Sequence, residues 1–149
     1  EAWRITMDAN SSTFVVAANL GGRPTIVDLE LGTYYYDGKL LEGATTLHLD
    51  PFQTVCLRRA QGAAIELLGT TSHLFPGLDI ERFACDNRSI SLTQFSAARL
   101  DGEALIAVPD ASGPWLVDGI PAAVETLGPR TVLRVPVSSV APRTVSGIL

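Results

Sequence analysis

Two histidines, His48 and His73, are the sequence's only candidates for the general base of a nucleophilic triad. Such a triad needs a nucleophile within reach of the histidine and a carboxylate that orients it. His48 alternates with Leu47 and Leu49 in TTLHLD, so we expect it to point away from a core lined by the leucines. His73 follows Ser72 in a loop-like stretch, and no G-x-S-x-G motif accompanies either histidine. We therefore predict no catalytic residues and a structural role for both histidines.

The spacing of the possible metal ligands and carboxylates does not match a known metal-binding or catalytic pattern either. The cysteines and histidines do not occur at C-x-x-C or H-x₃-H spacing, and no D-x-D-x-D loop is present. Asp28 and Glu30 are two residues apart in a strand-like run and so share one face, which is typical of a solvated surface. Cys56 and Cys85 are expected to be buried thiols, with a disulfide between them as the alternative. We predict no metal and no cofactor.

Aromatic side chains remain as candidates for ligand binding. Trp and Tyr rings stack on sugar faces because they combine a flat apolar face with a polar edge. In GTYYYDGK, strand alternation places Tyr34 and Tyr36 on one face and Tyr35 on the other, so the three rings cannot form one platform. Trp3, Tyr35 and Trp115 are our candidate carbohydrate-binding residues. The alternative for each is packing in a core or in a seam between modules.

Short segments with period-two alternation, separated by Gly, Pro and Asp, dominate the sequence. Strands are expected near 3–7, 13–19, 25–31, 33–36, 45–49, 53–59, 63–69, 80–84, 88–93, 95–100, 103–108, 115–117, 121–126, 131–137 and 143–148. This spacing predicts an all-β fold, an antiparallel β-sandwich. A seam near 58–64 favours two small tandem sandwich modules, residues 1–60 and 61–149, over a single larger sandwich.

Turn signals predict where the chain reverses. LDGE lies between two alternating runs and predicts a hairpin with a type I′ turn at Asp101-Gly102. NLGGRP is predicted to be a second hairpin turn, and Asp37-Gly38 is expected to begin the turn of a third hairpin after the tyrosines. Pro136 in LRVPV predicts an edge strand or a bulge, because proline cannot donate to a strand ladder.

The bulk composition limits the classes of partner. The 149 residues are 46% hydrophobic and 18% charged, with a net charge of −5, which is typical of an ordered globular chain. The basic residues are scattered, so we expect no basic face for a nucleic acid or an anionic membrane surface. No apolar run reaches the roughly 20 residues of a membrane-spanning helix. We therefore expect no nucleic-acid partner and no membrane partner.

The order of motifs in residues 13–58 resembles the C-terminal β-sandwich that follows the catalytic barrel in many glycoside hydrolases. TFVVAANLGGRPTIVDLELG is similar to a strand that ends in Asn, a G-x-x-P turn and an alternating strand. YYYDGKLLEG is similar to a segment with an aromatic-Asp pair and a hairpin. TTLHLDPFQTVCLR is similar to a closing hairpin, carried here by Leu47, Leu49, Pro51, Val55 and Leu57. Residues 63–149 resemble a further sandwich at the ends of such enzymes, in which GPWLVDGIPAAV is interpreted as a hairpin with an exposed Asp-Gly turn.

This resemblance implies a non-catalytic C-terminal region of a carbohydrate-active enzyme, because the catalytic carboxylates of that superfamily lie in the barrel. The implied partner is the catalytic domain of the same parent chain, which this region would cap or stabilise, and carbohydrate is a further candidate ligand. A carbohydrate-binding module and an immunoglobulin-like adhesion or surface domain are alternatives. Docking predicts a large exposed apolar patch, whereas a carbohydrate-binding module predicts coplanar exposed aromatic rings on a concave face.

Overall fold

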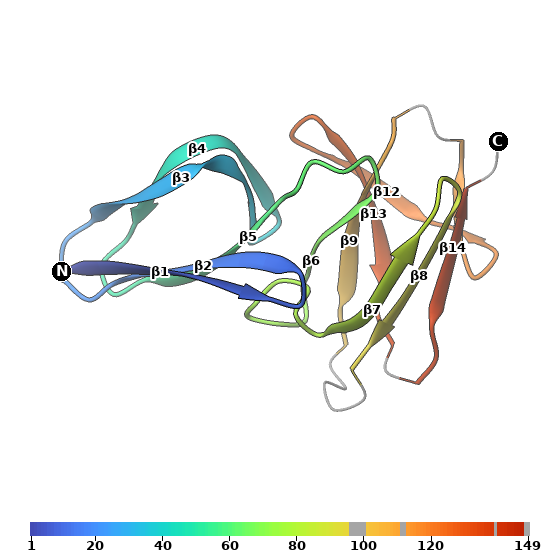
Figure 1. Ribbon diagram of the computed structural model, residues 1–149, viewed down its shortest axis with the longest axis horizontal. Coiled ribbons are helices and arrows are strands. Elements are labelled where there is room, and N and C mark those ends of the chain that lie inside the picture. Colours follow the sequence, from blue (N-terminus) through green and yellow to red (C-terminus); the bar gives the residue numbers. More distant parts are fainter. Residues whose placement is uncertain (96–100, 111–112, 139, 148–149) are drawn as a thin grey trace. The chain divides into compact units, whose positions relative to one another are not determined.

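The computed structural model describes residues 1–95, 101–110, 113–138 and 140–147 and shows an all-β chain (Figure 1). The described residues form fourteen strands in three antiparallel sheets, and they contain no helix. The predicted all-β, antiparallel, sandwich-type fold is therefore confirmed. The chain divides into two compact units, Glu1–Gln61 and Gly62–Leu149.

The first unit is a single five-stranded sheet that folds over on itself. Its strands are β1 (Ala2–Ala9), β2 (Ser12–Asn19), β3 (Thr25–Tyr36), β4 (Lys39–Leu49) and β5 (Thr54–Arg59), in the spatial order β1-β2-β5-β3-β4. The long β3–β4 hairpin arches over the β1-β2-β5 part of the sheet (Figure 1). Between these two layers lies a core of Val15, Ala17, Val27, Leu29, Tyr34, Leu47, Leu49, Val55 and Leu57.

A register shift in β3 makes this fold possible. Along β3, Val27 and Leu29 face the core from odd positions, whereas Tyr34 faces it from an even position. The pairing of β3 with β4 is irregular between Asp28 and Tyr34, and such a bulge changes which side chains face inward. Only the end of β3 pairs with β5, at Tyr34 and Tyr35, so the earlier half is released to form the upper layer.

The second unit is a sandwich of two sheets. Its strands are β6 (Glu66–Thr70), β7 (Ile80–Cys85), β8 (Ser89–Gln94), β9 (Glu103–Val108), β10 (Trp115–Val117), β11 (Ile120–Pro121), β12 (Ala123–Leu127), β13 (Arg130–Pro136) and β14 (Arg143–Gly147). One sheet has the order β11-β10-β14-β8-β7 and the other β12-β13-β9-β6. The core between them includes Ile80, Ile90, Leu92, Ile106, Trp115, Leu133, Val135 and Val145.

Three of the two-residue turns that join neighbouring strands have positive φ at both central residues, which is typical of type I′ hairpin turns. They are Asn10-Ser11 between β1 and β2, Asp37-Gly38 between β3 and β4, and Asp118-Gly119 between β10 and β11. The hairpin after the tyrosines and the exposed Asp-Gly hairpin in GPWLVDGIPAAV are thus confirmed.

Three other hairpin predictions are wrong, because the strands that flank each turn pair elsewhere. The strands on either side of NLGGRP, β2 and β3, are separated by β5. The strands of TTLHLDPFQTVCLR, β4 and β5, are separated by β3. After LDGE, β9 has both edges occupied, by β13 and β6. The strand predicted at 95–100 lies outside the described residues, apart from Phe95.

The glycine of LDGE is required by space and not by its backbone conformation. Gly102 does not have the positive φ that a type I′ turn needs. A Cβ atom on Gly102 would lie 2.6 Å from the Ser72 Cβ, so any side chain would force the two segments apart. Pro136 also differs from expectation, because β13 is an interior strand of its sheet. Pro136 is tolerated because it is the last residue of β13, beyond the end of the pairing with β12.

These contacts predict how substitutions at Gly102 behave. Gly102→Ala should lower the free energy of unfolding of the second unit by about 1–3 kcal/mol, the usual penalty for overpacking. Gly102→Asn should be at least as harmful, because its larger side chain meets Ser72. If the position instead needed a left-handed backbone, Asn would be tolerated better than Ala. Urea denaturation of the two variants distinguishes these outcomes.

Candidate docking surface

The predicted carbohydrate-binding residues do not form one site in the structure. Tyr35 is buried at the end of β3. Trp115 is buried in the core of the second unit, where its ring lies against Gly147. Only Trp3, on β1, leaves a substantial part of its side chain open to solvent, with 40% exposed. Of the three candidates, Trp3 alone offers a ring face to a ligand.

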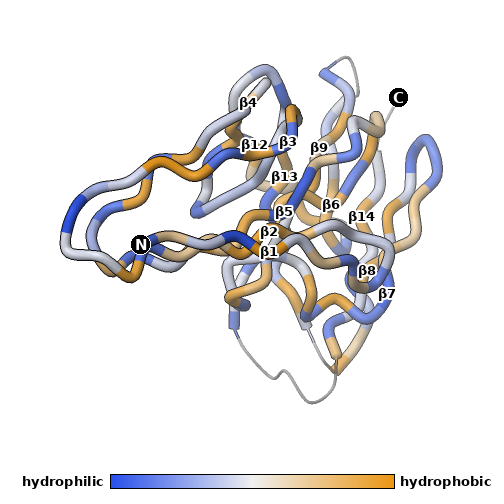
Figure 2. Tube along the Cα trace, turned by 60° about the vertical axis from the view of Figure 1, so that its left-hand side comes forward, coloured by the Kyte–Doolittle hydropathy of each residue, from blue (hydrophilic) through white to orange (hydrophobic). Residues whose placement is uncertain are grey.

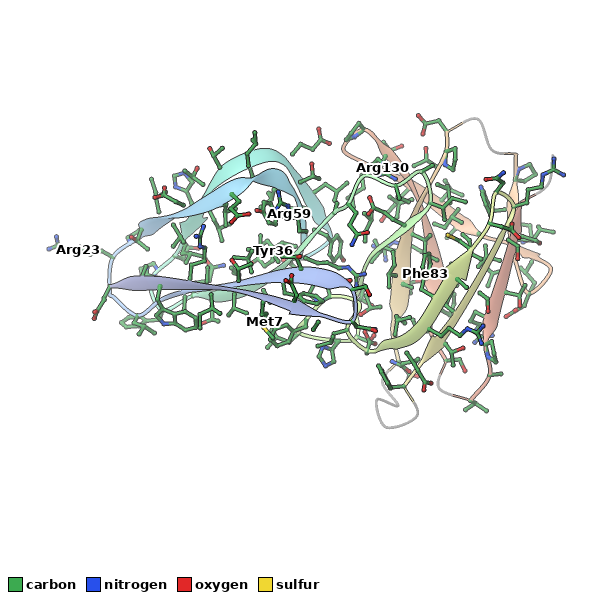
Figure 3. All side chains as sticks on the ribbon, viewed as in Figure 1. Met7, Arg23, Tyr36, Arg59, Phe83 and Arg130 are labelled. Carbon is green, nitrogen blue, oxygen red and sulfur yellow. The ribbon has the colours of Figure 1, made fainter. Side chains whose placement is uncertain are left out.

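Trp3 belongs to an apolar row on β1, which we call the β1 row: Trp3, Ile5 and Met7. These alternate residues share one face of the strand and are 40%, 55% and 38% exposed. Figure 2 shows hydrophobic residues running along the strands of each unit. In Figure 3, Met7 lies on the side of the β1–β2 hairpin that faces away from β3–β4, whereas Tyr36 lies between these layers. The β1 row is therefore on the outer face of the sheet.

This outer face is apolar over several strands. One row of cross-strand neighbours runs Met7, Phe14, Arg58, Tyr35 and Leu40 across all five strands. Phe14 and Tyr35 are buried, and the Arg58 guanidinium lies 5.8 Å from the Phe14 ring centroid, within cation–π range. The side chains at the centre of the outer face are thus buried, whereas those of the β1 row are partly exposed.

The row next to it has the same character. Ile5 is opposite Val16 on β2, and Val16 is opposite Cys56 on β5. Cys56 is buried, and burial raises the pKa of its thiol to about 11, so that it remains protonated at neutral pH. Strands β2 and β5 consequently bury side chains on both faces, which an ordinary two-layer sandwich does not require.

The cysteines only partly match the sequence prediction. Cys56 is buried as expected, but Cys85 is exposed, because it ends the edge strand β7. Both cysteines are free thiols.

Phe52 is an exposed aromatic residue outside the three candidates predicted from the sequence. It is 73% exposed and has a φ of 59°, a left-handed conformation that is uncommon for a bulky residue. Pro51 precedes it, and Gln53 N donates to the Asp50 carbonyl at 3.2 Å, which together describe a type II turn. The sequence signal was DPFQ, in which Phe occupies the position that normally requires Gly.

A buried carboxylate, Asp79, organises the 70–79 segment of the second unit. It accepts hydrogen bonds from Thr70 Oγ1 at 2.5 Å, Ser72 Oγ at 2.6 Å and Gln94 Nε2 at 3.0 Å. Burial alone would raise the pKa of Asp79, but these hydrogen bonds outweigh it and hold the pKa below the ordinary value of 3.8. The ionised carboxylate is therefore a structural anchor.

The predicted outward orientation of His48 is confirmed. His48 is exposed while its neighbours Leu47 and Leu49 are buried. His73 Nδ1 accepts a hydrogen bond from the Phe75 amide at 3.0 Å and does not contact the Ser72 hydroxyl, which donates to Asp79 instead. Within the described part of the chain, no His, Cys, Asp and Glu residues gather into a group that could hold a metal ion.

An open depression of about 320 Å³ in the second unit carries two charged residues, Arg130 and Asp110. Arg130 pairs with Glu66 at 3.0 Å and donates to the Ala63 carbonyl at 2.7 Å. Asp110 accepts a hydrogen bond from the Thr131 hydroxyl. Both side chains are held by neighbours of their own unit, so they serve its structure, and the β1 row remains the better candidate surface.

Comparison with protein-family models, with curated proteins and with solved structures finds no match for this chain. Among the described residues, no helix has the length and apolar character needed to cross a membrane.

The Asp79 cluster predicts a specific pH dependence. Because the folded pKa lies below the ordinary value of 3.8, the stabilisation by Asp79 is present above that pH and is lost as the pH falls through the folded pKa. Asp79→Asn should be less stable than the wild type at pH 7, and the difference should shrink as the pH falls below 3.8. Denaturant titrations at a series of pH values measure this difference. Glu81→Gln, on the exposed surface of β7, is the control for loss of a carboxylate and should be as stable as the wild type at pH 7.

Proposed function

We propose that this chain is a non-catalytic C-terminal β-sandwich region of a carbohydrate-active enzyme of the glycoside hydrolase type. Its role is to stabilise the catalytic domain of the same parent chain by docking through the β1 row. The observation that carries the proposal is the exposure of Trp3, Ile5 and Met7 on an otherwise covered apolar face. Contiguous exposed apolar residues of this kind mark interaction sites.

The expected binding energy suits a partner in the same polypeptide. Full burial of a large apolar side chain contributes roughly 1.5–3 kcal/mol, and the three side chains of the β1 row are already about half covered. Their further burial would contribute on the order of 3 kcal/mol, which is too little to hold two free proteins together at ordinary concentrations. A covalent link supplies an effective concentration in the millimolar range, at which a contact of this strength matters.

Two further observations support a structural role. The apolar positions of the resembling motif, Leu47, Leu49, Val55 and Leu57, all lie in the core of the first unit. Ser72 and His73 are neighbours in the sequence but have separate partners, because the Ser72 hydroxyl donates to Asp79 and His73 Nδ1 accepts from the Phe75 amide. These positions support an accessory role, in which the chain supplies a folded surface and the partner supplies the chemistry.

Matched isoleucines test the docking. Ile5 and Ile26 both lie in strands and are 55% and 56% exposed, but only Ile5 belongs to the β1 row. In the full-length parent protein, Ile5→Ser should lower the melting temperature of the catalytic domain by several degrees, whereas Ile26→Ser should not. In the isolated chain, both substitutions should have similarly small effects. Differential scanning calorimetry measures all four samples.

Equal effects of the two substitutions in the parent protein would contradict the docking, and a parent without a catalytic domain would remove its partner. Affinity electrophoresis in soluble glycans tests the carbohydrate-binding alternative. Retardation of the chain that Trp3→Ala abolishes would favour a carbohydrate-binding module instead.

A further inference from the structure

The unpaired edge of β1 has a sequence that is complementary to itself. We propose that two copies of this chain associate by antiparallel pairing of their β1 strands, so that two five-stranded sheets join into one. The proposal goes beyond the docking function, because it uses the backbone edge of β1 and the charged face behind it. Three features support it: the alignment of free backbone groups, the placement of two opposite charges, and the regularity of the strand.

The hydrogen bonds show which backbone groups of β1 point outward. The Leu20 amide donates to the Glu1 carbonyl at 2.8 Å, so residue 1 forms a hydrogen-bonded pair with β2. Alternation along an antiparallel ladder then directs the backbone groups of Trp3, Ile5 and Met7 toward β2. The groups of Ala2, Arg4, Thr6 and Asp8 are directed to the open edge. A second β1 strand can therefore pair only with these even positions.

The charges select one register among those that the backbone allows. When Thr6 pairs with Thr6 of the second copy, Arg4 of each copy lies directly opposite Asp8 of the other. Two symmetric Arg–Asp pairs then flank a central Thr–Thr pair, and opposite charges in such positions stabilise sheet pairing. Shifting the strands by two residues places Arg4 opposite Thr6 or removes it from the pairing. The charge pattern therefore specifies a two-fold dimer.

The same register also joins the two β1 rows. Ile5 of each copy lies opposite Met7 of the other, and Trp3 lies opposite Ala9, all on the outer face. The charged side chains are already ordered within each copy. Arg4 Nη1 donates to the Asp28 carbonyl at 2.6 Å, and Asp8 accepts from the Thr13 hydroxyl at 2.6 Å. A guanidinium has five donors and a carboxylate about four acceptor positions, so both can add a partner.

β1 is the longest regular strand at a sheet edge among the described residues. Natural edge strands are blunted by bulges, prolines, charged side chains or short length. β1 carries two charges, Arg4 and Asp8, but they have opposite signs and attract a second copy in the register described above. Edge strands β4, β6 and β7 have register shifts against their neighbours, and β11 has two residues and contains Pro121. The remaining edge strand, β12, pairs regularly with β13 but is shorter than β1, with five residues. In contrast, β1 pairs with β2 without interruption over eight residues and contains neither Pro nor Lys. Such an edge is open to another strand.

Charge reversal tests the proposal. Sedimentation equilibrium of the whole 149-residue chain should show a monomer–dimer equilibrium. Arg4→Asp and Asp8→Arg should each weaken dimerisation at least about tenfold, because each faces like charges across both symmetric pairs. The double variant Arg4→Asp/Asp8→Arg should restore the dissociation constant to within about threefold of the wild type. Arg23→Asp and Glu42→Arg, on exposed residues outside β1, are controls for net charge and should have no effect.

A backbone variant tests the edge itself. Thr6→Pro removes one outward amide but no amide that pairs with β2, so it should abolish the dimer while circular dichroism shows a folded chain. A chain that stays monomeric up to millimolar concentration would overturn the proposal. A dimer that is unaffected by Thr6→Pro, or that the double charge variant fails to restore, would equally overturn the β1 pairing.

Discussion

Strands β2 and β5 of the first unit carry apolar side chains on both faces of the sheet. Both faces of these strands must therefore be shielded from water, which constrains the position of the β3–β4 hairpin and the character of β1. On one face the β3–β4 hairpin supplies the cover, and the register shift in β3 exists because that hairpin must leave β5 in order to fold back. On the other face, Phe14, Cys56 and Tyr35 are buried, whereas the three side chains of the β1 row are partly exposed. The exposed β1 row is the remaining part of a surface that the hydrophobic effect would otherwise bury.

The sequence predicts which side chains share a face of each strand, because side-chain alternation is a local property. His48 is exposed between two buried leucines, and Tyr34 and Tyr36 face the core while Tyr35 takes the other side. The tight turns at Asp37-Gly38 and Asp118-Gly119 were equally predictable, because both central residues need a positive φ that Asp-Gly provides.

Strand pairing could not be read in the same way. NLGGRP and DPFQ do reverse the chain, yet in each case another strand inserts between the two that they join. LDGE looked like a type I′ turn, but Gly102 is there because Ser72 approaches from a segment thirty residues away. The Asp79 cluster likewise joins Thr70 and Gln94 across the second unit. Such contacts depend on long-range packing, which leaves no local pattern.

The account of function depends on one surface, the outer face and edge of β1. Hydroxyl-radical footprinting measures the solvent exposure of this surface directly, because Trp3 and Met7 react quickly when exposed. The buried Trp115 serves as an internal reference. In the dilute isolated chain, Trp3 and Met7 should be oxidised much faster than Trp115. If the chain docks as proposed, both side chains should be protected severalfold in the full-length parent protein, while the oxidation of Trp115 is unchanged. Equal oxidation of Trp3 and Met7 in the two samples would contradict it.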